Sequence, residues 1–163
     1  MMRTNGRHIM GKNIGKIAIL LWVVTILGAV FFIVRGGSVD KQIGVRTSIT
    51  LDHGERELVL DEMRTMLQST QKIVQGLAND DMLQVSSAGK AAGMGAAVDL
   101  DPRFLSKLPL EFKTLGFSMH ADMDSIAKAA EQGASAQEIS KMLANTLAKC
   151  VACHSAWQLR VEN

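Results

Sequence analysis

Two cysteines and a histidine near the carboxyl end of the chain have the spacing needed for redox chemistry. They stand in the sequence Cys150-Val151-Ala152-Cys153-His154, which contains both cysteines of the 163 residues. Two thiols at this spacing can each form a thioether with one vinyl group of a porphyrin, and the adjacent imidazole can ligate its iron. The motif therefore predicts one covalently bound haem c, with His154 as an axial ligand.

Two other kinds of site share the Cys-x-x-Cys spacing. A zinc site would need two further ligands, whereas the remaining histidines, His8, His53 and His120, are scattered along the chain. A thioredoxin-like dithiol is expected beside a βαβ pattern, and the sequence shows no alternation typical of strands. The dithiol stays open as an alternative to covalent haem.

The amino-terminal part of the chain carries a membrane signal. Residues 17–34 form an uncharged apolar run that is long enough for a membrane-spanning helix. The residues before it include four basic and no acidic side chains, which predicts a cytoplasmic amino terminus over residues 1–16. We expect an uncleaved signal anchor over residues 17–35. A cleaved signal peptide is the alternative, although no clear cleavage pattern ends the run.

The formal net charge of +2 is unevenly distributed along the chain. Residues 1–35 carry five basic and no acidic groups, which leaves 13 basic and 16 acidic groups in the rest of the sequence. A mildly acidic domain is not typical of a nucleic-acid-binding protein. The basic end suits membrane topology and contact with anionic lipid headgroups.

The region after the apolar run reads as a linker, residues 36–54, followed by a helical domain, residues 55–163. Apolar residues at steps of three and four predict helices over 55–78, 81–94, 110–132 and 136–158, with a loop at 95–109. We expect Asp80 to cap the second of these helices and a capping box of Ser135 and Glu138 to begin the last. On the last helix, Cys150, Cys153 and His154 would share one face. The pattern predicts an all-α fold, an antiparallel four-helix bundle without strands, preceded by one transmembrane helix.

The chain resembles the class II c-type cytochromes, the cytochrome c′ superfamily, over residues 55–160. The resemblance is carried by Glu62-Met63-Arg64, by Leu108-Pro109 with Phe112 and Gly116, and by a haem motif that follows the other helices. It implies a four-helix bundle with the haem on the fourth helix. Low-spin members fill the sixth iron position with a methionine of the first helix and carry electrons. High-spin members leave that position open or bind small gases there.

The first predicted helix offers two methionines on its inward face, Met63 and Met66. The resemblance of the Glu-Met-Arg segment implies that Met63 ligates the iron, with Met66 as the alternative; an open sixth position is the third possibility. His120 is a weaker candidate, because we expect it to be a partly exposed helix residue. We expect Trp157 to pack against the ring edge or the end of the first predicted helix. The candidates for pairing with the haem propionates are Arg64, Lys149 and Arg160.

These observations predict a membrane-anchored monohaem cytochrome that transfers single electrons and is not an enzyme. We expect it in a bacterial inner membrane, with the haem domain in the periplasm and redox proteins of the periplasm or membrane as partners. A homodimer is possible from the resemblance. Two alternatives stay open: a five-coordinate module that binds nitric oxide or carbon monoxide, and a haem subunit of a larger membrane respiratory complex.

Overall fold

The computed structural model describes residues 7–36, 45–97 and 100–162, with side chains from residue 14 onward. The predictions for residues 1–6 and for residues 37–44 of the linker lie outside these ranges. Within them the chain is all-α apart from two short strands, in the order α1 Arg7–Arg35, β1 Thr47–Leu51, α2 His53–Ala78, α3 Met82–Ala91, a 3-10 turn Met94–Ala97, α4 Pro102–Lys107, α5 Leu110–Glu131, α6 Ala136–Ala156 and β2 Trp157–Val161. The four predicted helices correspond to α2, α3, α5 and α6.

Helix α2 begins two residues before the predicted start because Asp52 caps it. The Asp52 carboxylate accepts a hydrogen bond from the Glu55 N–H at 2.8 Å, and the Glu55 carboxylate accepts one from the Asp52 N–H at 3.1 Å. This reciprocal capping box satisfies two backbone donors that a helix start leaves unpaired. The predicted capping box of Ser135 and Glu138 is confirmed at the start of α6.

The turn between α2 and α3 differs from the prediction by one residue. The N-cap of α3 is Asp81, whose carboxylate accepts a hydrogen bond from the Gln84 N–H at 2.9 Å. The prediction of Asp80 as the cap was wrong because Asp80 adopts a left-handed backbone, with φ at 53°. Aspartate is among the few residues that tolerate this conformation, so the chain uses the first of two aspartates to turn and the second to cap.

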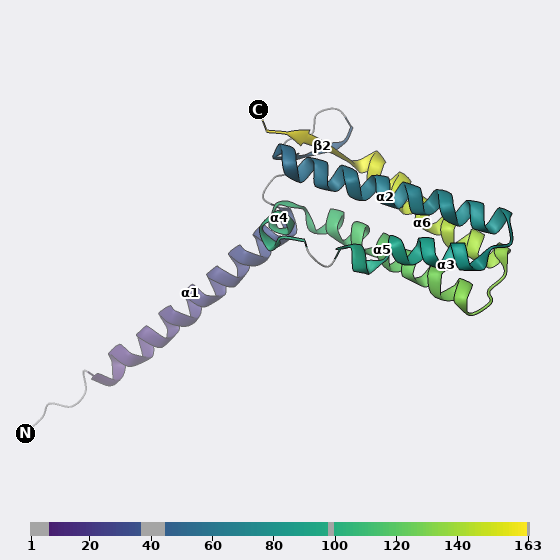
Figure 1. Cartoon of the computed structure of the whole chain (residues 1–163). Coiled ribbons are helices and arrows are strands. Elements are labelled where there is room, and N and C mark those ends of the chain that lie inside the picture. Colours follow the sequence, from purple (N-terminus) through teal and green to yellow (C-terminus); the bar gives the residue numbers. More distant parts are fainter. Residues whose placement is uncertain (1–6, 37–44, 98–99, 163) are drawn as a thin grey trace, which may run out of the picture.

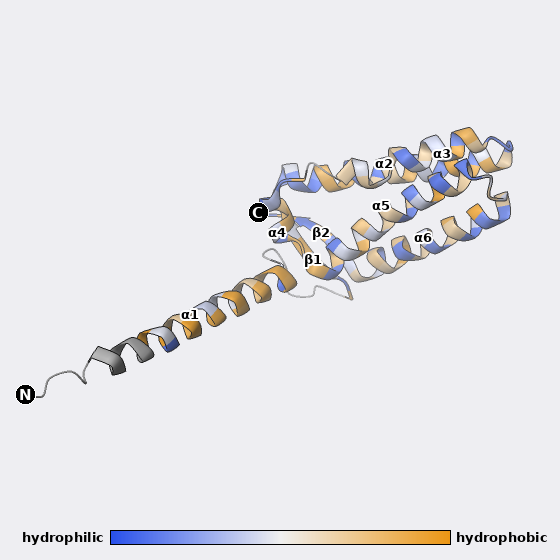
Figure 2. Ribbon diagram, turned by 90° about the horizontal axis from the view of Figure 1, so that it is seen from below, coloured by the Kyte–Doolittle hydropathy of each residue, from blue (hydrophilic) through white to orange (hydrophobic). Residues whose placement is uncertain are grey.

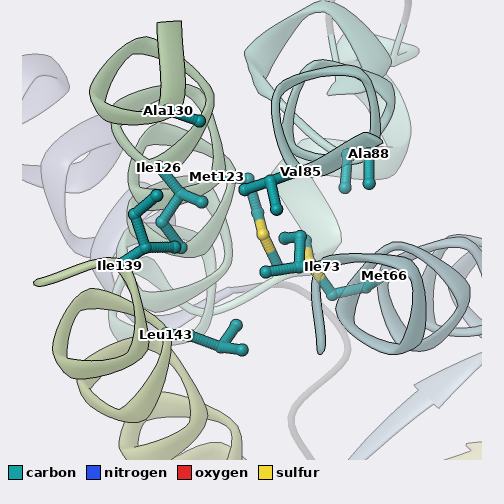
Figure 3. Packing of buried hydrophobic residues seen from close by; sticks show 10 residues of the cluster. Met66, Ile73, Val85, Ala88, Met123, Ile126, Ala130, Ile139 and Leu143 are labelled. Carbon is teal, nitrogen blue, oxygen red and sulfur yellow. The ribbon is translucent and has the colours of Figure 1, made fainter. Parts of the chain in front are cut away.

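Helix α2 packs on α3, α3 on α5 and α5 on α6, whereas α2 and α6 meet at few points (Figure 1). Apolar side chains from all four helices meet in one core (Figure 3), which includes the fully buried Ile73, Val85, Met123, Ile126 and Ile139. Gly89 lets α3 approach α5 closely, because a Cβ there would lie 2.7 Å from the Met123 carbonyl oxygen.

Two parallel strands form a feature that the sequence did not predict. Strand β1 pairs with β2 in a register that runs from Thr47 opposite Trp157 to Leu51 opposite Val161. The expected absence of strands was therefore wrong: β1 lies inside the predicted linker, and α6 ends at Ala156 rather than 158. Each strand has only five residues, too few for a period of two to stand out from the sequence.

A second, smaller core lies beneath the strands, where a loop was expected at 95–109. Helix α4 occupies part of that segment, with Asp101 as its N-cap and Pro102 in its first turn. Its buried Phe104, together with Leu108, packs against Ile49 and Leu51 of β1.

Helix α1 projects away from the other helices, and both views place its end beside α4 (Figures 1 and 2). Its stretch Ile14–Arg35 is long and apolar enough to cross a membrane by length and composition. All the side chains described there are exposed, and Figure 2 shows them as mostly hydrophobic. The expected helix at 17–35 is confirmed as long and apolar enough to span a membrane. A signal sequence near an amino terminus has the same length and composition.

Candidate cofactor site

The haem motif, Cys150 to His154, lies in the last two turns of α6, which ends at Ala156. Cys153 is buried, Cys150 is half-buried and His154 is exposed. Both cysteines are free thiols. All three side chains line one cavity, so the structure brings together the residues that the motif nominated.

This cavity, called the candidate cavity below, has a volume of about 390 Å³ and lies between α2 and α6. Helices α4 and α5 complete its wall, whose side chains are mostly apolar. A second cavity of about 280 Å³ adjoins it, because Met63, Phe112, Cys153 and His154 line both. The volume and apolar lining are those of a site for a cofactor or a small molecule.

Gly116 leaves part of the candidate cavity without a side chain. It is the seventh residue of α5, and a Cβ built on it would meet no atom within 4 Å. Glycine inside a helix costs about 1 kcal/mol relative to alanine, so this position sacrifices helix stability. The space kept free at Gly116 is what a flat group lying against α5 would need.

The environment of the two thiols favours their neutral form. Burial raises the pKa of Cys150, and burial followed by the charge of the neighbouring Cys150 raises the pKa of Cys153. A catalytic or redox dithiol instead needs a lowered pKa, because the thiolate is the nucleophile. The site therefore lacks the activation that the dithiol alternative requires.

The two candidate methionine ligands have different surroundings. Met66 is only 7 % exposed and belongs to the core, where Figure 3 shows it near Ile73. Met63 is half-buried and lines both cavities together with His154. A third methionine, Met119 of α5, lies with its Sδ 3.5 Å from the Cys150 Sγ.

His120 is buried in the wall of the candidate cavity, so the prediction of a partly exposed residue was wrong. Its Nδ1 lies 2.8 Å from the Ala92 carbonyl oxygen, which can only accept, so Nδ1 carries the hydrogen. Its Nε2 lies 3.6 Å from Glu62 Oε1, a buried atom that has no hydrogen-bond partner within the described chain. The spacing of His120 from Phe112 and Gly116, at helical steps, was the signal for its inward position.

The basic residues that line the two cavities are not those that the sequence nominated. Lys113 lines the candidate cavity, and Arg46 and Arg56 line the second cavity, where Arg56 also pairs with Glu57 at 3.0 Å. Of the nominated residues, Arg64 pairs with Glu57 and Asp61, Lys149 pairs with Asp122 at 2.6 Å, and Arg160 is an exposed residue of β2. No sequence pattern links Arg46 or Arg56 to His154. Arg46 directly precedes β1 and Arg56 lies in the first turn of α2, so both reach the second cavity only through the tertiary fold.

Trp157 lies three residues after His154 and lines the second cavity. It is the C-cap of α6 and the first residue of β2. Its indole meets the Phe112 ring edge-on, with centroids 6.1 Å apart and planes at 82°, a favourable aromatic geometry. This contact ties the end of α6 to the start of α5.

Comparison of the chain with protein-family models, with curated proteins and with solved structures finds no match. Among the described residues, no three histidine, cysteine, aspartate or glutamate side chains form a group that could hold a metal ion. The chemistry of the site must therefore be argued from the haem motif and the cavity beside it.

Proposed function

We propose that this protein is a membrane-anchored c-type cytochrome that carries single electrons through one covalent haem, and that it is not an enzyme. One observation carries the proposal: Cys150, Cys153 and His154 converge, from one face of α6, on a large apolar cavity. The free space at Gly116 supports it, because no side chain occupies that part of the α5 wall. A haem bound there supplies the one-electron chemistry.

The chain's own residues would hold the group and exclude water. Cys150 and Cys153 would carry the two thioethers, and His154 would donate a ring nitrogen to the iron. Porphyrin nitrogens supply four of the iron's ligands, so a cluster of three protein ligands is not required. The apolar walls from α2, α4 and α5 would keep the site at low dielectric. Arg46 and Arg56 are placed to pair with carboxylates at the edge beside His154.

The helix arrangement supports the class II type of cytochrome. Consecutive packing of α2, α3, α5 and α6 suits an antiparallel four-helix bundle, with the haem motif on the last helix. The strands β1 and β2 would be an addition to that architecture.

For the sixth iron position we propose Met63, with Met66 as the alternative. Met63 lines both cavities together with His154, whereas Met66 lines only the candidate cavity and is also buried in the core. Replacing Met63 by alanine should leave the haem attached, abolish the weak near-infrared band of sulfur-to-iron coordination and shift the iron toward high spin. The same change at Met82, a partly buried core methionine of α3, is the control. A low-spin spectrum unchanged in Met63→Ala but lost in Met66→Ala would reverse the assignment.

The covalent haem has a direct test. The chain, expressed with an intact cytochrome c maturation system, should keep its pigment after denaturation and washing with acidified acetone. Replacing Cys150 and Cys153 by serine should release the pigment, whereas replacing the exposed Ser155 by alanine should not. A colourless washed wild-type chain would remove the basis of the proposal.

We propose further that α1 anchors the protein in a bacterial inner membrane with the helical domain in the periplasm. The apolar stretch Ile14–Arg35 and the basic residues before it support this topology. Redox proteins of the membrane or periplasm would be the partners.

A second candidate function is the binding of nitric oxide or carbon monoxide at an open sixth position. The observation that favours it is the pair of His120 Nε2 and Glu62 Oε1, 3.6 Å apart in the wall of the candidate cavity, because Glu62 Oε1 is buried there without a hydrogen-bond partner among the described residues. Rapid carbon monoxide uptake by the ferrous protein, without loss of a methionine band, would support this function over electron transfer.

A further inference from the structure

The membrane helix ends where the helical domain begins. The stretch Ile14–Arg35 has 22 residues, which at a rise of about 1.5 Å per residue is roughly 33 Å long. The hydrocarbon core of a bilayer is about 30 Å thick. The span therefore uses nearly all its length to cross the core, and Arg35 reaches the level of the lipid headgroups.

The next residue, Gly36, packs directly on the helical domain. Its φ of +75° ends the helix in the left-handed conformation that glycine adopts without strain. A Cβ at Gly36 would lie 2.6 Å from the Pro109 nitrogen and 2.7 Å from the Leu108 carbonyl carbon. The two backbones are thus in contact, and no spacer separates the end of the span from the turn at Leu108 and Pro109.

The segment that receives Gly36 has two sides. Phe104, Leu105 and Leu108 line the candidate cavity. On the outer side, Arg103, Ser106 and Leu110 are exposed, with 92 % of the Arg103 side chain and 41 % of Leu110 open to solvent. Figures 1 and 2 both place α4 at the end of the domain where α1 arrives.

We infer that α4 and the turn after it rest on the bilayer, with the outer side of this segment, Arg103, Ser106 and Leu110, against phospholipid headgroups. The inference relies on the proposed membrane anchoring by α1. Phospholipid is the partner of this surface because the proposed span leads directly into it. A guanidinium can bind lipid phosphates, and an exposed leucine suits the interface. The candidate cavity then lies one helix above the membrane surface, about 10 Å.

The test uses the full-length chain in lipid nanodiscs that contain nickel-chelating lipids. A nitroxide label is attached at Ser106→Cys, and in a second protein at Gln132→Cys, an exposed position at the opposite end of α5. Nickel at the headgroups should enhance relaxation of the Ser106 label several-fold over that of the Gln132 label. Equal enhancement at the two positions would overturn the inference.

A third protein tests the contact itself. Gly36→Val in the Ser106→Cys chain should push the turn away from the anchor and reduce the nickel effect at Ser106. An unchanged effect would show that this contact does not seat the domain.

Two controls separate this inference from the proposed function. The wild-type chain should take no label, because both of its cysteines are in thioethers. Labelling of Cys150 and Cys153 would refute covalent haem, and the nickel test would then be read in chains that also carry Cys150→Ser and Cys153→Ser, so that the label reports Ser106 or Gln132 alone. Release of the chain from membranes by alkaline carbonate would refute the anchor, and the inference with it.

Discussion

Gly116 offers the sharpest test of whether the candidate cavity is occupied in the working protein. In an empty cavity a methyl group there would meet no atom within 4 Å, so Gly116→Ala should gain the helix preference of alanine, about 1 kcal/mol. If a haem lies against α5, the same methyl must displace it, and overpacking costs about 1–3 kcal/mol. We therefore expect Gly116→Ala to lower the stability of the haem-loaded protein, by up to about 2 kcal/mol net.

The larger change Gly116→Leu should go further and reduce the amount of haem attached per chain. The measurement is the haem absorbance per mole of protein after purification, combined with urea unfolding of the loaded form. Thr114→Leu is the matched control, because Thr114 is an exposed residue of the same helix two positions away. It should change neither the haem content nor the absorption spectrum.

One result would refute this reasoning. If Gly116→Leu loads haem to the wild-type level, and Gly116→Ala stabilises the loaded protein by about 1 kcal/mol, the free space is not used by the cofactor. The haem would then have to lie elsewhere, and the assignment of the cavity would be wrong.

Two further predictions concern the stability of the helical domain. Ile73 is fully buried at the centre of the main core, and Ile73→Ala should lower the free energy of unfolding by about 2–5 kcal/mol in urea titrations; a loss below about 1 kcal/mol would contradict the packing. The hydrogen bond from the Glu55 N–H holds the pKa of Asp52 below its ordinary value of 3.8. Because the folded-state pKa is lowered, the ionised Asp52 stabilises the protein at pH values above its ordinary pKa. This stabilisation is lost as the pH falls through the folded-state pKa. The difference in free energy of unfolding between wild type and Asp52→Ala, measured by urea titration, should therefore be constant near neutral pH and shrink below pH 3.8. A difference that does not change with pH would contradict this prediction.

Local patterns predicted the parts of the site that one helix carries. Cys150, Cys153 and His154 are set by spacing on a single helix, and the Ser135 capping box marked where that helix starts. The wall of the candidate cavity that α5 forms was predicted less well. The burial of His120 depends on how α5 meets the end of α3, where the Ala92 carbonyl accepts its hydrogen bond. The helical spacing from Phe112 and Gly116 indicates which face of α5 carries His120, but no local pattern contains its contact with Ala92.

The strand pair shows why the remainder depends on tertiary structure. Strand β1 precedes α2 and β2 follows α6, so a pairing across more than one hundred residues joins the start of the helical domain to the end of α6. A five-residue strand has too few residues to fold alone, and it forms because Ile49 and Leu51 are buried against α4. That packing holds Trp157, which in turn fixes the last turn of α6 beside Phe112. The last turn of α6, which carries His154, is therefore held from two directions, by the helix itself and by a strand that the sequence did not reveal.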